Sequence, residues 1–183
     1  MTAGTPPTTV ETSDADFVMI REFDAPPELI WRAWTDPDLL ARWWGPEGFT
    51  NHGCVVDARP GGRWRVIMRG PAGTDFDQDY PVDSTIVSIE PPRRLVMTSG
   101  GENYPDDWLE QYNRFVSEGS ADTQVETVME MTLEPLPGDR TRQTVRQTFK
   151  SAEARDAILK MGAEQGWTGS FAKLDGLVAE LAR

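Results

Sequence analysis

Cysteine and histidine are almost missing from this chain of 183 residues, which has one of each, Cys54 and His52. A single cysteine excludes an internal disulfide and a zinc cluster of thiolates, and it fits a reducing compartment such as the cytoplasm. Asp57 is near His52, but an odd separation along an expected strand puts the two side chains on opposite faces, so a Ser-His-Asp triad is unsupported. A transition-metal site would have to be built largely from carboxylates, which suit harder ions. We therefore expect no metal and no cofactor, and the sequence names no catalytic residue.

Basic residues are also scarce, with 18 Lys and Arg against 30 Asp and Glu, which gives a formal net charge of −12. Nucleic acid requires a basic face, so this balance argues against a nucleic-acid partner. No apolar run approaches the roughly 18 residues that a membrane-spanning helix needs. The N-terminus lacks the basic and apolar parts of a signal peptide, and residues 1–16, rich in Thr, Pro and Ala, indicate a flexible tail. We expect a cytoplasmic protein without a membrane span.

The C-terminal end of the chain shows a clear helical periodicity. Its apolar residues are spaced by four, three, four and three positions, as on one buried helix face. These residues are Trp167, Phe171, Leu174, Val178 and Leu181. Residues 17–149 are mostly short β-like runs separated by Gly and Pro, so the expected partner of this helix is the concave face of an antiparallel sheet. At this length, residues 17–183 fit a single domain.

The expected elements begin with a strand at residues 17–23, followed by two short helices, one after the cap Asp24 and one at residues 38–43. Further strands are expected at residues 52–59, 63–69, 80–89, 95–99, 125–133 and 141–149. The last strand is ambiguous, because both of its faces carry polar side chains. It fits a solvated edge strand, or a strand whose Gln143 and Gln147 face a wet cavity beneath the C-terminal helix.

Several short motifs add to this pattern. They are Trp43-Trp44-Gly45-Pro46, Arg59-Pro60-Gly61-Gly62-Arg63-Trp64, Pro91-Pro92-Arg93-Arg94-Leu95 and Gly166-Trp167. With them, residues 18–181 resemble the bacterial SRPBCC proteins homologous to the activator of the ninety-kilodalton heat-shock protein's ATPase. The resemblance implies an α+β, helix-grip fold (START-like, birch-pollen-allergen-like), in which a curved antiparallel sheet wraps around a long C-terminal helix and two short helices follow the first strand. It also implies a hydrophobic cavity between sheet and helix, which relatives use to bind lipids, sterols, polyketides or other small apolar molecules.

Residues 100–122 depart from this resemblance, which implies only a brief hairpin connection there. Trp108, Leu109, Tyr112 and Phe115 recur at helical spacing, so we predict an inserted helix with an apolar face. The inserted helix could plug a gap in the core, cover the cavity as a lid, or form a homodimer contact.

The leading functional hypothesis is a module that binds a small hydrophobic or aromatic ligand in the cavity. The partner would then be a small apolar molecule, and methionines suit such a site because they repack around different shapes. The predicted ligand-binding residues are Trp44, Trp64, Val66, Met68, Trp108, Tyr112, Met129, Met131, Gln143, Trp167 and Phe171.

Two other functions stay open. The first is an enzyme, such as a cyclase or a hydrolytic or proton-transfer catalyst, that uses a buried carboxylate or Tyr in the same cavity. The second is a chaperone-associated interaction module, in which the inserted helix offers an apolar face. A calcium loop at Asp75, Asp77 and Asp79 is disfavoured, because Tyr80 stands where Gly is needed and Ile86 where a bidentate Glu belongs.

Overall fold

The computed structural model describes residues 7–100, 103–116 and 125–183. Across these residues the chain forms one eight-stranded antiparallel sheet, in the order β1-β2-β8-β7-β6-β5-β4-β3. The strands are β1 (Thr9–Ser13), β2 (Asp16–Phe23), β3 (Thr50–Val56), β4 (Arg63–Arg69), β5 (Asp79–Glu90), β6 (Arg94–Ser99), β7 (Thr127–Leu136) and β8 (Arg140–Phe149). The helices are α1 (Pro27–Thr35), α2 (Pro37–Trp43), α3 (Asp106–Phe115), α4 (Ala152–Lys160) and α5 (Ala163–Leu181).

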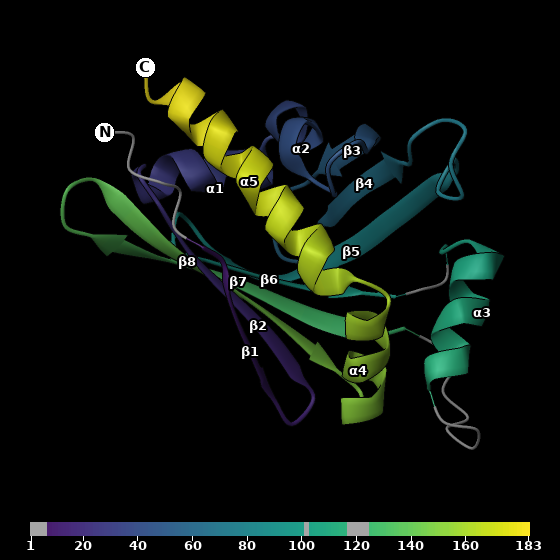
Figure 1. Ribbon diagram of the computed structural model, residues 1–183. Coiled ribbons are helices and arrows are strands. Elements are labelled where there is room, and N and C mark those ends of the chain that lie inside the picture. The colour runs from purple at the N-terminus through teal and green to yellow at the C-terminus, as the bar shows by residue number, and fades with distance from the viewer. Residues whose placement is uncertain (1–6, 101–102, 117–124) are drawn as a thin grey trace.

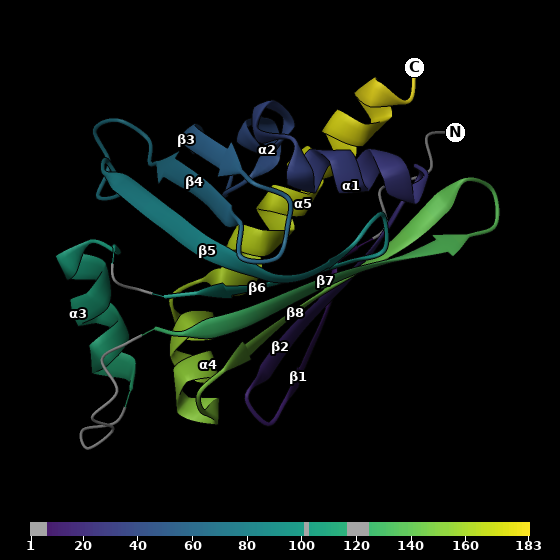
Figure 2. The same cartoon turned by 180° about the vertical axis from the view of Figure 1, so that it is seen from behind.

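The sheet curves around α5, and this arrangement confirms the predicted helix-grip fold. Figures 1 and 2 show α5 crossing one side of the sheet, with α1 and α2 on that same side. The inserted helix α3 stands apart from α1 and α2 and contacts α4. We call the side of the sheet that faces α5 the inner face, and the opposite side the outer face.

Alternation along the strands decides which side chains reach the inner face. In β4, Trp64 and Val66 are fully buried, whereas Arg63 and Arg65 point outward and pair with Asp83 on β5. This strand, which was expected at residues 63–69, therefore has one apolar and one basic side. The same alternation runs through the neighbouring strands, so the inner face is mostly apolar.

The helical C-terminal stretch consists of two helices. Gly162 lies between α4 and α5 with a φ of 91°, a left-handed conformation that glycine adopts without a steric penalty. On α5, Phe171, Leu174 and Val178 are buried, as the spacing predicted. Trp167 is only half-buried, so the expectation that the buried face begins at this residue is too simple.

The N-terminal segment differs from the expectation of a flexible tail. Thr9–Ser13 forms β1 and pairs antiparallel with β2, so the prediction is wrong for these residues. Val10 lies opposite Met19 and packs against the core. Residues 1–6 lie outside the described residues, as do 101–102 and 117–124 of the inserted segment.

The position of β8 resolves the ambiguity of the last strand. It lies between β2 and β7, so the solvated-edge interpretation is wrong. Thr141, Gln143 and Val145 are fully buried on the inner face, and Phe149 follows on the same side. Polar groups on this face are thus enclosed between the sheet and the helices.

Candidate functional site

A group of aromatic side chains fills the space between the inner face of the sheet, α1, α2 and α5. Its five indoles, which we call the tryptophan cluster, are Trp34, Trp43, Trp44, Trp64 and Trp167. The ring centroids of Trp44 lie 4.7 Å from Trp64 and 5.0 Å from Trp167, both edge to face. Trp34 is at the centre, since its ring contacts all four other indoles. Offset and edge-to-face contacts of this kind are favourable beyond their buried area.

Local chain geometry brings the tryptophans together. Asp36 caps α2 by accepting hydrogen bonds from the backbone N–H groups of Asp38 and Leu39, at 3.0 and 3.4 Å. This cap sets the turn between α1 and α2, so that Trp34 and Trp43 meet with ring centroids 5.0 Å apart. Two tryptophans that belong to different helices therefore become one packed unit.

Two of the indole N–H groups donate to backbone carbonyls. Trp43 Nε1 donates to the carbonyl of Ala33 at 2.8 Å, and Trp64 Nε1 donates to the carbonyl of Trp34 at 3.0 Å. Both hydrogen bonds are buried, where a lost acceptor would leave a costly unpaired donor. They fix the rings of α2 and β4 against α1.

The other two indole hydrogen bonds go to glutamines of β8. Trp34 Nε1 donates to Gln143 Oε1 at 2.8 Å, and Trp167 Nε1 donates to Gln147 Oε1 at 3.2 Å. The inward polar groups of β8 thus serve as acceptors for tryptophans. Gln143 is fully buried, and its Nε2 has no hydrogen-bond partner among the described residues.

A buried arginine lies next to Gln143. Arg21 on β2 pairs directly with Gln143 in the sheet register and is only 4% exposed. Its guanidinium makes an ion pair with Asp175 on α5 at 2.6 Å and donates to Thr8 Oγ1 at 3.1 Å. Arg21 Nε has no partner among the described residues. The floor of the site therefore carries charge and polar groups as well as aromatic rings.

Lys173 ties α5 to the loop after α2. Its Nζ donates to the carbonyls of Trp44 and Pro46, both at 3.2 Å. Burial lowers the pKa of the Lys173 ammonium, an effect that Glu47 partly opposes. These contacts hold the backbone of Trp44 close to Trp167 on the helix.

The predicted site residues of the insertion form a separate aromatic stack on α3. Ring centroids are 4.4 Å apart for Tyr104 and Trp108, and 5.8 Å apart for Trp108 and Tyr112. Tyr112 is 2% exposed, and burial raises the pKa of Tyr104 to about 12. Gln78 Nε2 on the 70–78 turn donates to Asp107 Oδ2 at 2.9 Å, which fastens α3 to the start of β5.

The remaining predicted site residues lie on the inner faces of β4 and β7. Val66, Met129 and Met131 are buried there, while Met68 is half-buried beside Gly45. Nine of the predicted residues therefore lie on the inner face of the sheet, on α5 or at the end of α2, whereas Trp108 and Tyr112 lie on α3. Whether any of them contacts a ligand stays a prediction.

Sequence reasoning missed Trp34, Arg21 and Asp175 as site residues. Trp34 shares a helix face with Ile30, which indicated burial but not a central position. Arg21 alternates with Met19 and Phe23 on the inward side of β2, and a charge within that apolar period is a signal that could have found it. Nothing in the local sequence connects Asp175 to Arg21.

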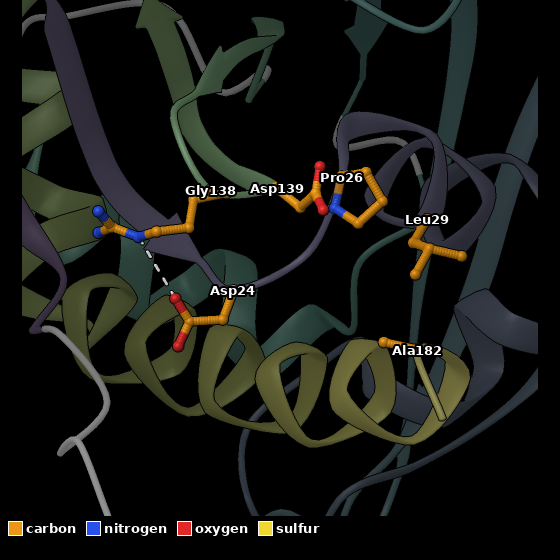
Figure 3. Close-up of a pocket in the computed structure, with 7 residues that line it drawn as sticks. Asp24, Pro26, Leu29, Gly138, Asp139 and Ala182 are labelled. Carbon is orange, nitrogen blue, oxygen red and sulfur yellow. Dashed lines mark ion pairs between the residues drawn. The ribbon is translucent and has the colours of Figure 1, made fainter.

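Two pockets lie elsewhere on the molecule. Figure 3 shows one of about 500 Å³ between the start of α1, the β7–β8 turn and the end of α5, where Arg140 pairs with Asp24 at 3.3 Å. It is lined by Asp24, Pro26, Leu29, Gly138, Asp139, Arg140 and Ala182. The second, of about 340 Å³, lies at the ends of β6, β7 and β8 and includes Thr98, Thr127 and Phe149. Neither contains a residue of the tryptophan cluster, whose rings occupy the interior beneath α5.

The described residues contain no group of three His, Cys, Asp or Glu side chains that could hold a metal ion. His52 Nε2 lies 3.2 Å from Asp79 Oδ1 on the outer face, and both side chains are about half exposed. Over the same part of the chain, no helix is both long and apolar enough to cross a membrane.

The fold and the inward aromatic rings define a helix-grip protein with a packed aromatic interior beneath its C-terminal helix. Residues 24–179 match the family described as activator of Hsp90 ATPase homolog 1-like protein, so the chain belongs to this family. No curated protein matches the chain.

Solved structures with the same fold come from several bacteria. A protein from Arthrobacter aurescens is 29% identical, with a TM-score of 0.75, and the alignment covers 94% of this chain and 91% of that one. A protein from Mycobacterium smegmatis is 26% identical, with a TM-score of 0.75 and coverage of 96% and 99%. The AHSA1 protein from Silicibacter pomeroyi is 26% identical, with a TM-score of 0.64 and coverage of 92% and 98%.

Proposed function

We propose that this protein binds a small hydrophobic or aromatic ligand between the inner face of the sheet and α5. The observation that carries the proposal is the tryptophan cluster, in which α1, α2, β4 and α5 all contribute an indole to one region. Ligand sites are typically lined by aromatic side chains with a few placed polar groups. Gln143 and Gln147 supply such polar groups within this region.

Trp167 is the member of the cluster through which a ligand would enter. It is half-buried, while the other four indoles are at most 6% exposed. Its ring contacts Trp34, Trp44 and Phe171, with the Phe171 centroid 5.3 Å away. A rotamer change of this one side chain would open the inner rings to a ligand without moving the sheet, and such changes are common on binding.

The indole faces favour a flat aromatic or ring-containing ligand. A ligand ring that replaces the ring of Trp167 would find Trp44 edge to face and Trp34 nearly parallel, with an interplanar angle of 22° to the displaced indole. Both arrangements are favourable for aromatic pairs. A cytoplasmic site of action is part of the proposal, since a protein with one cysteine needs no oxidising compartment.

The alternatives have weaker support among the described residues. An enzyme in the same place would need a carboxylate free to accept a proton, but Asp175 is held by Arg21 at 2.6 Å. An interaction module would need an open apolar face on α3, but Tyr112 is buried and Trp108 and Leu109 are half-buried. We therefore interpret α3 as a cover over the core near α4.

The test is retention of small molecules by purified protein. The protein is incubated with a bacterial metabolite extract and washed, and the retained compounds are identified by mass spectrometry. We expect an aromatic or ring-containing compound to be retained. Trp167→Ala should reduce retention at least about tenfold, because the rotated indole would no longer cover the bound ligand ring.

Trp31→Ala is the matched control. Trp31 is also a half-buried tryptophan, but it lies on α1 outside the tryptophan cluster. Retention should be unchanged in this variant. If the wild-type protein retains no compound, or if both variants lose it equally, the site does not lie at the tryptophan cluster.

A further inference from the structure

Two buried hydrogen-bond donors on the floor of the proposed site have no acceptor within the part of the chain that the structure describes. Gln143 Nε2 and Arg21 Nε are unpaired among the described residues, and their side chains are 0% and 4% exposed. The other polar atoms of both side chains are occupied, by Trp34 for Gln143 and by Thr8 and Asp175 for Arg21. Buried donors without a partner are rare in folded proteins and call for an explanation.

The two donors belong to neighbouring residues. Arg21 and Gln143 pair directly across β2 and β8, so both side chains leave the same face of the sheet. Their Cβ atoms are therefore about 4.5–5.5 Å apart. Arg21 reaches α5 and Gln143 reaches α1, which places both donors between the sheet and the helices.

Neither side chain can pair its free donor by turning to another orientation. The indole Nε1 of Trp34 is a donor only, so Gln143 must present Oε1 to it and keep Nε2 turned away. The guanidinium of Arg21 is fixed by its ion pair with Asp175 and its hydrogen bond to Thr8. Both donors are thus held in place, and none of the described residues supplies an acceptor.

We propose that the ligand carries an uncharged carbonyl group, whose oxygen accepts hydrogen bonds from Arg21 Nε and Gln143 Nε2. This inference rests on the proposed function and specifies the ligand of that same site. A carbonyl oxygen has two lone pairs and no hydrogen, so it can accept from two donors that leave the same face of the sheet. A water molecule in the same position would bring two hydrogens that need acceptors of their own.

The charge balance favours a neutral oxygen over a carboxylate. The positive charge of Arg21 is already compensated by Asp175 at 2.6 Å, so the pair is neutral as a unit. An added anion would be buried without a free counter-charge, which is unfavourable. The ligand class is therefore an apolar molecule with one carbonyl, such as an aryl ketone, whose rings contact the tryptophan cluster.

The experiment uses three probes that share two benzene rings. Benzophenone has a central carbonyl, diphenylmethane has a methylene in its place, and 4-benzoylbenzoate adds a carboxylate to the ketone. Affinities for the full chain are measured by quenching of tryptophan fluorescence. We expect benzophenone to bind about tenfold more tightly than diphenylmethane, because its carbonyl adds a net hydrogen-bonding contribution of about that size. Benzophenone should also bind more tightly than 4-benzoylbenzoate.

Two variants remove the donors one at a time. Gln143→Leu lacks Nε2, and Arg21→Lys keeps a positive charge for Asp175 but lacks Nε. Each should lower the affinity ratio of benzophenone to diphenylmethane toward one, mainly by weakening benzophenone, because one of the two proposed donors is lost. The ratio is measured on protein shown to be folded by circular dichroism, and Arg21→Lys tests the inference alone if Gln143→Leu does not fold.

Thr141→Val is the control on the same strand. Thr141 is also fully buried on the inner face of β8, but its hydroxyl already donates to the carbonyl of Ala25 at 2.7 Å. Its replacement should leave the affinity ratio at the wild-type value. A ratio that falls equally in this control would show a general loss of packing and overturn the assignment of the two donors.

The probe results separate this inference from the proposed function. Equal binding of benzophenone and diphenylmethane to the wild-type protein would overturn the carbonyl assignment and leave ligand binding intact. Tighter binding of 4-benzoylbenzoate would overturn the assignment of an uncharged group. If none of the three probes binds, the inference and the proposed aromatic site both fail.

Discussion

Both faces of β8 carry polar side chains, but these side chains interact differently on the two faces. On the outer face, Arg142 and Arg146 are 41% and 45% exposed and pair with carboxylates of neighbouring strands. On the inner face, Thr141 and Gln143 are fully buried and make single directed hydrogen bonds to Ala25 and Trp34. One strand thus combines exposed ion pairs on one face with buried, directed hydrogen bonds on the other.

This difference decides how much each polar group contributes to the stability of the fold. Exposed ion pairs are typically worth about 0–1 kcal/mol each, because water and salt screen them. A buried hydrogen bond adds little more when it is made, but the loss of one partner leaves the other unpaired at about 1–3 kcal/mol. The inner face therefore sets the position of the tryptophans, whereas the ion pairs of the outer face add little to stability.

Trp34→Ala, which changes a side chain packed against the inner face, should cause the largest loss of stability. Trp34 is fully buried, its ring contacts the other indoles of the tryptophan cluster, and its Nε1 donates a hydrogen bond to Gln143 Oε1. We expect a loss of about 3–5 kcal/mol in the free energy of unfolding, measured by urea denaturation. Trp167→Ala should cost clearly less, since that ring is half-buried. Equal losses for the two variants would show that central position in the cluster does not matter.

Deletion of residues 1–13 should have an intermediate effect, because β1 supplies groups to both faces. Val10 packs on the inner side opposite Met19, and Thr8 Oγ1 accepts from Arg21, whereas Glu11 is exposed on the outer side. We expect the melting temperature to fall by several degrees, since a loss of 1 kcal/mol corresponds to about 2–4 °C at this chain length.

Deletion of residues 1–6 alone is the control for this truncation. It leaves Thr8 and the whole of β1 in place, so the melting temperature should stay at the wild-type value. If the longer deletion also leaves it unchanged, the pairing of β1 with β2 contributes nothing to stability.

Most of the fold could be predicted from the sequence because its signals are local. The period of two in residues 63–69 and the spacing of Phe171, Leu174 and Val178 each specify a face without any long-range contact. The strand β1 was missed for the opposite reason. Its five residues are mostly exposed and have weak alternation, so only the free edge of β2 determines that they pair.

The candidate site could be predicted only in part. The aromatic residues of β4 and α5 follow from periodicity and the family motifs, but the central contacts connect distant parts of the chain. Trp34 and Gln143 are 109 residues apart, and Arg21 and Asp175 are 154 apart. No local pattern encodes such pairs, and the sequence could not decide which face of β8 is buried until its place in the sheet was known.

Asp16→Asn, on the outer face of the sheet, should cause the smallest loss of stability. Asp16 accepts a hydrogen bond from Thr148 Oγ1 at 2.8 Å and pairs with Arg146, and these contacts lower the pKa of its carboxyl below the usual 3.8. Because the folded-state pKa is depressed, the stabilisation is present above pH 3.8 and is lost as the pH falls through the folded-state value. We expect Asp16→Asn to cost about 0.5–1 kcal/mol at neutral pH, as for an exposed ion pair.

The pH dependence provides the decisive measurement for Asp16. In urea denaturation at a series of pH values, the difference between wild type and Asp16→Asn should shrink below pH 3.8, where the wild-type carboxyl becomes protonated. Thr148→Val removes the hydrogen bond that is the largest single cause of the lowered pKa. It should therefore move the carboxyl pKa, measured by NMR titration, back toward its usual value. A difference that stays constant through this pH range would mean that the outer-face carboxylate acts through packing. The two faces of the sheet would then not differ in the way argued above, with screened ion pairs outside and directed hydrogen bonds inside.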